Sequence, residues 1–123
     1  MRFARITASI LGISAVVSGA FGAHALKNEL AAKEMTQTWQ TACLYHLIHA
    51  LAVLVVAVAA GSTGSARYRG AVLAWLAGVL LFSGSLYGLA LGGPRWLGPV
   101  TPLGGVAFIV GWALIAWPGK TEA

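Results

Sequence analysis

The chain has 123 residues, of which 59% are hydrophobic and 9% charged, and its formal net charge at pH 7 is +5. Soluble domains carry roughly 25% charged residues, so this composition excludes an ordinary water-soluble domain. It indicates one integral membrane domain, residues 1–123, in a lipid bilayer. The basic residues are scattered between apolar runs and cannot neutralise a row of phosphates, so we expect no nucleic-acid partner.

The first apolar run, residues 6–26, has two interpretations. Arg2 and Arg5 before it, and the Ala-His-Ala sequence at 23–25, are typical of a secretory signal peptide. The run is longer than the apolar region of ~7–15 residues that such signals use. Its length suits a helix that crosses the ~30 Å hydrocarbon layer, so we predict a first membrane span.

Residues 27–40 are the most polar stretch of the chain. Glu29 precedes Lys33 by four residues, an order that supports a helix through an ion pair. We expect a short interfacial helix that begins near Lys33, lies partly at the membrane surface and leads into the second span. Trp39 fits the headgroup level, where indole rings gather. The second span is predicted over residues 41–60.

Two further apolar runs, residues 70–91 and 100–117, predict the third and fourth spans. Residues 61–69 are rich in Gly and Ser and are typical of a loop. Residues 92–99 contain two prolines, which lack the backbone donor that a helix needs. The predicted fold class is therefore all-α: a four-helix transmembrane bundle with a short interfacial helix between spans one and two.

The basic residues also predict an orientation. Four spans place the N-terminus, the 61–69 loop and the C-terminal tail on the same side of the membrane. These segments contain five basic residues: Arg2, Arg5, Arg67, Arg69 and Lys120. The other two connections carry three: Lys27, Lys33 and Arg95. Because excess Lys and Arg mark the cytoplasmic side, we predict an inner-membrane protein with both termini in the cytoplasm.

Small residues recur on two of the predicted spans and indicate close helix packing. They are Gly12, Gly19 and Gly22 in the first span and Gly84, Gly88 and Gly92 at the end of the third. The second set forms a G-x-x-x-G-x-x-x-G ladder. The partner of these faces is a helix of the same chain, of a second copy or of another membrane protein.

All three histidines are predicted near one membrane face. His46 and His49 are one helical turn apart, and His24 ends the first span. Together they could bind a transition metal or haem iron, or relay a proton. The alternative is a structural cluster in which neutral imidazoles bond to neighbouring helices. Other candidates for such a polar cluster are Cys43, Tyr45, Ser85 and Tyr87.

The acidic residues limit the chemistry. The three acids are Glu29, Glu34 and Glu122, and all lie outside the predicted spans. No membrane-embedded carboxylate is therefore present to exchange protons for a transported cation. We predict no catalytic residue and assign no cofactor.

Four stretches resemble a known family. They are SGAFGAHAL at 18–26, TWQTACLYHLIHALAVL at 38–54, LFSGSLYGLALGG at 81–93 and LGPVTPLGG at 97–105. They are similar to the small bacterial inner-membrane proteins of the YgdD and YwdK type. The resemblance implies a four-span membrane protein and argues against signal cleavage, since His24 lies within one of the motifs. The residues that fall in these characteristic stretches are Gly22, His24, Tyr45, His46, His49, Gly84, Ser85 and Tyr87.

Three functional hypotheses follow. The first is a non-enzymatic accessory or scaffold protein that packs against partners through its small-residue faces. The second is a metal, haem, redox or proton-relay role for the three histidines. The third is binding of a lipid or small molecule in a cleft lined by Tyr45, Tyr87 and Trp96.

Overall fold

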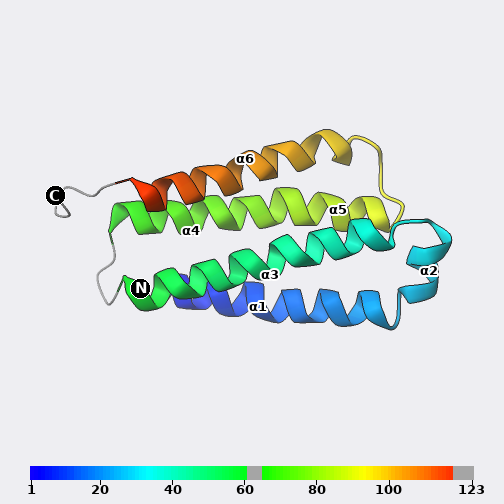
Figure 1. Cartoon of the computed structure of the whole chain (residues 1–123), viewed down its shortest axis with the longest axis horizontal. Helices are drawn as coiled ribbons and strands as arrows, with labels where there is room; N and C mark the ends of the chain where they lie inside the picture. Colours follow the sequence, from blue (N-terminus) through cyan, green and yellow to red (C-terminus); the bar gives the residue numbers. More distant parts are fainter. Residues whose placement is uncertain (61–64, 118–123) are drawn as a thin grey trace.

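The computed structural model describes residues 1–60 and 65–117. Its elements, in chain order, are α1 (Arg2–Ala23), α2 (Lys27–Ala32), α3 (Thr36–Ala59), α4 (Ala66–Gly78), the π-helical turn η1 (Val79–Ser83), α5 (Gly84–Ala90) and α6 (Leu97–Ala116). Every regular element in these two ranges is helical, so the all-α prediction is confirmed. The segments α4, η1 and α5 follow one another without a break, and four long rods lie side by side as an antiparallel bundle (Figure 1).

Four helical segments within the described ranges are long and apolar enough to cross a membrane: Arg2–Ala23, Thr36–Ala59, Ala66–Ala90 and Leu97–Ala116. Each of the four predicted spans thus corresponds to one of these helices, with shifted ends. The first begins earlier than predicted because Arg2 and Arg5 are helical, and long cationic side chains can extend to the interface.

The predicted 61–69 loop is too long at its C-terminal end, because α4 already begins at Ala66. Ser65 is the N-cap of this helix, and its hydroxyl accepts a hydrogen bond from the backbone N–H of Tyr68. The residues at 61–64 lie outside the described ranges.

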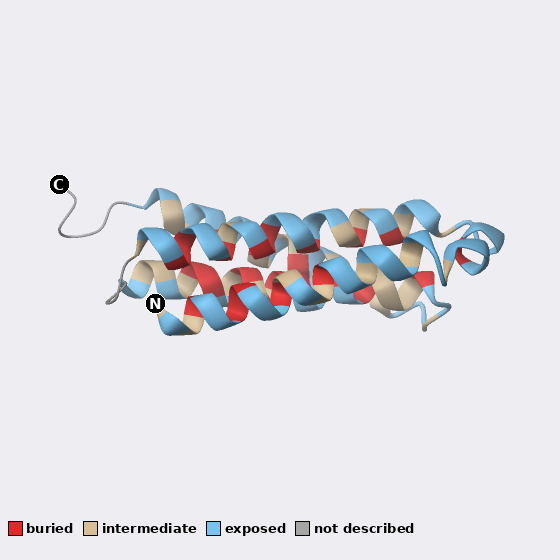
Figure 2. Cartoon of the chain, turned by 90° about the horizontal axis from the view of Figure 1, so that it is seen from below, coloured by how far each residue is buried: buried red, intermediate tan, exposed pale blue. Residues whose placement is uncertain are grey.

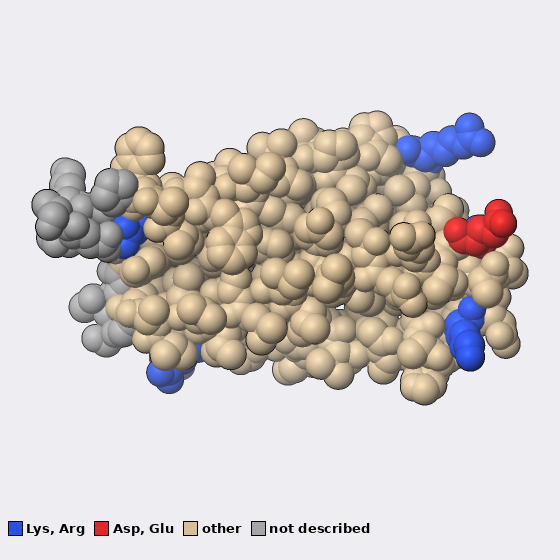
Figure 3. Space-filling model, in the orientation of Figure 1, with Lys and Arg blue, Asp and Glu red and all other residues tan. Residues whose placement is uncertain are grey.

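Large apolar side chains cover the outer faces of the bundle. They include Ile13, Val58, Leu80 and Ile109, each more than 60% exposed. Exposed and buried residues alternate around each helix, with the buried ones facing inward (Figure 2). Charged side chains gather at the two ends and leave an uncharged band between them (Figure 3). Such a surface is stable in a lipid bilayer and costly in water.

The predicted connector helix exists, but it differs from the expected one. It is the separate helix α2, followed by a turn in which Glu34 has a φ of 55°, and α3 begins only at Thr36. The helix that was expected to begin near Lys33 and to run into the second span is α3, which begins three residues later and is separated from α2 by this turn. The left-handed backbone at Glu34 breaks the helix and redirects the chain.

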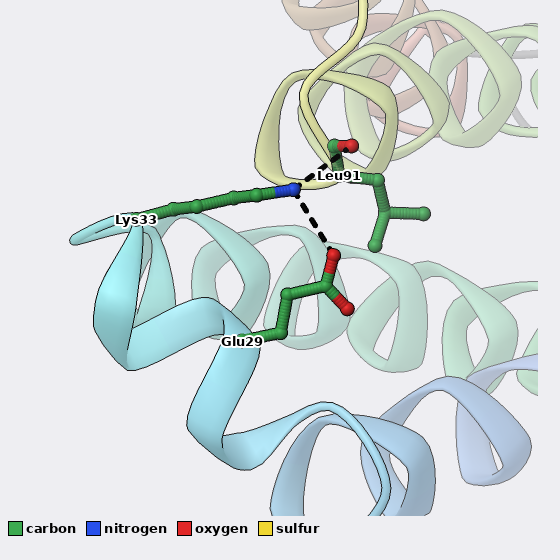
Figure 4. A network of polar contacts seen from close by, with 3 residues as sticks. All are labelled: Glu29, Lys33 and Leu91. Atoms are coloured by element: carbon green, nitrogen blue, oxygen red, sulfur yellow. Dashed lines mark hydrogen bonds and ion pairs between the residues drawn. The ribbon is translucent and has the colours of Figure 1, made fainter.

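Lys33 ties this connector to the turn between α5 and α6. Its Nζ donates to Oε1 of Glu29 at 3.0 Å and to the backbone carbonyl of Leu91 at 3.3 Å (Figure 4). The predicted Glu29–Lys33 ion pair thus forms, and it is largely exposed. Below it, Leu30 is buried and packs in a small apolar cluster with Trp39 and Ala90. The connector consequently closes one end of the bundle.

Aromatic residues facing glycines hold the α4–η1 segment against α6. The pairs are Trp75 with Gly111, Phe108 with Gly78, and Phe82 with Gly104. A Cβ built on Gly78 or Gly111 would lie 2.3 Å from an atom of the facing ring, and one on Gly104 would lie 2.2 Å from the backbone nitrogen of Phe82. The three pairs keep one antiparallel register. Because lipid offers no hydrophobic driving force between helices, this close fit supplies packing energy.

Candidate functional site

Polar contacts between the spans converge on α3. The indole N–H of Trp39 donates to the carbonyl of Ser18 on α1 at 2.9 Å. The hydroxyl of Ser83 on η1 donates to the carbonyl of Ala42 at 2.8 Å. Hydrogen bonds from His46 and His49 add three more contacts with neighbouring helices. The helix that carries the histidines is thus the polar centre of the bundle.

His46 joins α1, α3 and α5. Its Nε2 lies 2.9 Å from the hydroxyl of Ser14, and its Nδ1 lies 2.8 Å from the hydroxyl of Tyr87. Sγ of Cys43 is 3.7 Å from the same Tyr87 oxygen. These four side chains form a chain of hydrogen-bonding groups that runs across the bundle.

Donors and acceptors can be arranged in two ways along this row of four side chains. In the first, Ser14 donates to the carbonyl of Ile10, 2.8 Å away, and accepts from Nε2–H of His46, while Tyr87 donates to Nδ1. In the second, Ser14 donates to Nε2, Nδ1–H donates to Tyr87, and Tyr87 donates to Cys43. Either neutral tautomer of His46 therefore has two partners.

The ring nitrogens of His49 have only one possible arrangement of donor and acceptor. Its Nδ1 lies 2.8 Å from the carbonyl of Tyr45, which can only accept, and its Nε2 lies 3.0 Å from the indole N–H of Trp112, which can only donate. These partners fix the neutral Nδ1–H tautomer. The imidazole also stacks on Phe108, with ring centroids 3.8 Å apart. His49 consequently bonds α3 to α6.

The structure does not bring His24 to the other two histidines. It is the C-cap residue of α1, and its side chain is exposed. Across residues 1–60 and 65–117, no three His, Cys, Asp or Glu side chains come close enough to hold a metal ion. Metal binding at His46 or His49 would also require breaking hydrogen bonds that both rings already make. The geometry favours the structural cluster over a metal site.

The remaining candidates of the polar cluster have separate surroundings. Ser85 bonds to the hydroxyl of Thr101 on α6, whereas the ring of Tyr45 packs on Phe82, 4.6 Å between centroids. The ring of Tyr87 lies 4.6 Å from that of Trp39. Trp96 is 66% exposed. The three aromatic residues expected to line one cleft thus have different neighbours.

A groove lies instead between α1 and α3. Its main hollow has a volume of about 620 Å³ and is bounded at one end by Leu30 of α2. It is lined by Ala15, Val16, Gly19, Ala20, Gly22, Ala23, Leu30, Thr36, Trp39, Gln40, Cys43, Leu44 and Leu47. A second hollow of about 150 Å³ shares Leu47 and is lined by Ala8, Ser9, Gly12, Ala50, Leu51 and Leu54. We call the two hollows together the α1–α3 groove.

The six glycines predicted to pack have different positions. A Cβ at Gly12 or Gly19 would meet no described atom within 4 Å, and these two residues line the groove. Gly22 faces the indole of Trp39, with a Cβ-to-Nε1 distance of 2.3 Å.

In the ladder at the end of the third span, Gly84 has only an ordinary contact, at 3.9 Å, and Gly88 faces the side chain of Leu97. Gly92 has a φ of +89° and forms the turn next to Lys33.

Three hydrogen-bond partners were not predicted from the sequence. Ser14, Thr101 and Trp112 each complete a bond to a predicted polar residue. One available signal was the spacing of Gly104, Phe108 and Gly111, which places a large ring between two glycines on one helix face.

Comparison with known proteins agrees with the four-span architecture. The family model described as "Protein of unknown function (DUF423)" matches residues 18–105. The chain is 45% identical over 115 residues to the UPF0382 membrane protein YwdK of Bacillus subtilis, which covers 89% of each chain. It is 45% identical over 115 residues to the UPF0382 inner membrane protein YgdD of Escherichia coli K12, covering 93% of this chain and 86% of that one.

A UPF0382 membrane protein of Staphylococcus saprophyticus is 41% identical over 111 residues, covering 89% of this chain and 90% of its own. No solved structure matches the chain. Four membrane-spanning helices and these similarities over most of the length confirm the expected resemblance. The chain belongs to the DUF423 family, whose relatives named above are UPF0382 membrane proteins.

Proposed function

We propose that this membrane protein is a non-enzymatic accessory subunit whose α1–α3 groove receives a transmembrane helix of another membrane-protein chain. The observation that carries the proposal is the open face of α1, where Gly12 and Gly19 line the groove and have no described atom within 4 Å of a built Cβ. Gly78 and Gly111, by contrast, pack inside the bundle against the rings of Phe108 and Trp75.

The length of the groove favours a helix over a lipid tail as its occupant. The lining of the groove on α1 extends from Ala8 to Ala23. At ~1.5 Å per residue this is a rise of roughly 22 Å, most of the ~30 Å hydrocarbon layer. A single acyl chain occupies one leaflet, about half of that thickness. A transmembrane helix would cover the whole groove.

The chemistry of the groove favours the same occupant. Small residues on one face let two backbones approach closely, and close approach is what drives helix association in lipid. The side chains that rim the larger hollow include Val16, Leu44 and Leu47, and the polar Thr36 and Gln40 lie toward the connector end. The surface therefore suits an apolar helix with a polar group near the membrane interface.

We also propose the orientation of the bundle. Arg2, Arg5, Arg67 and Arg69 lie at the end where α1 and α4 begin, while Lys27, Lys33 and Arg95 belong to the opposite connections. The excess of positive charge supports a cytoplasmic location for the N-terminal end of α1 and the C-terminal end of α6.

A matched pair of substitutions tests the accessory role. Gly19→Leu fills the groove, whereas Gly98→Leu adds the same side chain on α6, where a built Cβ also meets no described atom within 4 Å. Membranes that contain each variant at native level are dissolved in a mild detergent and separated by native electrophoresis. We expect a complex larger than the monomer for the wild type and for Gly98→Leu, and monomer alone for Gly19→Leu.

Two results would contradict this function. One is a wild-type protein that migrates as a monomer from its own membranes. The other is a complex that persists unchanged in Gly19→Leu and in Gly12→Leu. Circular dichroism of each purified variant checks that the helices remain folded.

A further inference from the structure

We propose that the helix received by the α1–α3 groove carries a neutral hydrogen-bonding side chain, a carboxamide or a hydroxyl, that pairs with Gln40 and Thr36. The assignment rests on the accessory role proposed above, since it concerns the occupant of the same groove. The pairing lets the groove distinguish one transmembrane helix from another.

Two polar side chains lie at one end of the main hollow. Thr36 and Gln40 are four residues apart on α3, so they share a face of the helix, and both line this hollow. At ~1.5 Å per residue, Gln40 is only about 6 Å from the start of α3, close to the membrane interface. Leu44 and Leu47 continue the same lining toward the membrane centre. The main hollow therefore changes from polar to apolar along α3.

The other polar side chains of this hollow already have partners inside the protein. The indole N–H of Trp39 donates to a backbone carbonyl of α1. The thiol of Cys43 contacts the hydroxyl of Tyr87 at 3.7 Å. By contrast, the side chains of Thr36 and Gln40 make no hydrogen bond within the part of the chain that the structure describes. Their donors and acceptors therefore remain available to an occupant.

A helix that fills the groove changes the surroundings of Gln40. In the protein alone this side chain is exposed, and its carboxamide can bond to interfacial water. An arriving helix displaces that water, and a carboxamide left without partners in apolar surroundings destabilises the complex. A side chain that both donates and accepts, such as that of Asn, Gln, Ser or Thr, removes this cost. The groove consequently discriminates against helices that are apolar along their whole length.

The charge of the lining favours a neutral partner group. None of the described residues that line the main hollow is charged. Lys33, three residues before Thr36, bonds instead to Glu29 and to the carbonyl of Leu91. A carboxylate or an ammonium group on the partner helix would therefore be buried without a counter-ion, which is costly.

Two designed peptides test the pairing. Each is a transmembrane helix of Leu and Ala with a G-x-x-x-G-x-x-x-G stripe and lysines at its ends. One carries Asn near both ends, so that its direction in the bilayer does not matter, and the other carries Leu at these positions. Binding in lipid vesicles is measured by energy transfer from the tryptophans of the protein to a dansyl group on the peptide. We expect the wild type to bind the Asn peptide about threefold more tightly, as one interhelical hydrogen bond provides.

A matched pair of substitutions assigns this preference to the groove. Gln37 is also exposed on α3, but it lines neither hollow. Gln40→Leu should lose the preference for the Asn peptide, whereas Gln37→Leu should keep it. Circular dichroism checks that both variants remain helical. The comparison of the two peptides on the wild type needs no folded variant.

The outcomes separate this pairing from the accessory role. Equal binding of both peptides by the wild type, with both lost in Gly19→Leu, would overturn the pairing and leave the accessory role intact. A preference that persists in Gln40→Leu, or that Gln37→Leu also removes, would overturn the pairing as well. Binding of neither peptide, or binding that Gly19→Leu leaves unchanged, would contradict the pairing and the accessory role together.

Discussion

The indole N–H of Trp112 donates to Nε2 of His49 over 3.0 Å and so joins α6 to α3 within the membrane-spanning part of the bundle. The other ring nitrogen of His49 donates to the carbonyl of Tyr45 on its own helix. A histidine with both nitrogens paired in this way stabilises the fold as a neutral group. It also has no lone pair left for a metal ion.

A double-mutant cycle on this pair measures the bond. Trp112→Phe removes the donor, His49→Phe removes the acceptor while keeping a ring against Phe108, and the double variant removes both. Because interhelical hydrogen bonds in membranes contribute ~0.6 kcal/mol on average and up to ~1.7, we expect a coupling energy in that range. Unfolding of the purified protein by increasing SDS in mild detergent provides the free energies. A coupling energy of zero would show that the bond does not stabilise the bundle.

Gly104→Ala should destabilise the protein by about 1–3 kcal/mol, as overpacking typically does. The new methyl group would lie 2.2 Å from the backbone nitrogen of Phe82, so α6 would have to move away from η1. Gly98→Ala is the control. Gly98 is on the same helix, α6, and a methyl group there would meet no described atom within 4 Å. It should be neutral or stabilising, since alanine favours helix over glycine. The unfolding temperatures of the two variants are compared with that of the wild type. An equal change in both would contradict the described register of α6 against the α4–η1 segment.

Metal analysis addresses the histidines. We expect the purified wild type to contain no stoichiometric zinc, copper, iron or haem, because all four ring nitrogens of His46 and His49 have protein partners. Elemental analysis and an absorption spectrum of protein prepared without chelators provide the measurement. One equivalent of metal in the wild type that disappears in His46→Ala would restore the metal hypothesis.

A reporter at each end tests the proposed orientation. A fluorescent protein fused after the last residue, or before the first, should fluoresce because it lies in the cytoplasm. An alkaline phosphatase fused at either position should be inactive. The expectation rests on the arginines at the N-terminal end of the bundle. Active phosphatase at either terminus would reverse the orientation.

The spans were predictable because length and apolar composition determine which segments can cross a bilayer. The end of the connector helix was not, since the turn depends on the left-handed backbone at Glu34, a residue whose side chain favours no such turn by itself. The π-helical turn at 79–83 was equally hidden, although it carries Ser83 to the carbonyl of Ala42.

The polar contacts were only half predictable. The spacing of His46 and His49 shows that they are neighbours on one helix, but not that one faces Ser14 and Tyr87 and the other Trp112. A sequence gives the period of a helix and leaves its rotation against each neighbour open. The glycines follow the same rule, because a small-residue face shows that a helix can pack closely without identifying its partner.

Cross-linking from the groove tests the accessory role most directly. Val16, which lines the α1–α3 groove, and Ile109, on the outer face of α6, are both 68% exposed. A diazirine-bearing amino acid is placed at each position in turn and illuminated in native membranes. The account predicts a discrete protein–protein product from position 16 and mainly lipid adducts from position 109. Lipid adducts alone from both positions, or the same protein product from both, would contradict it.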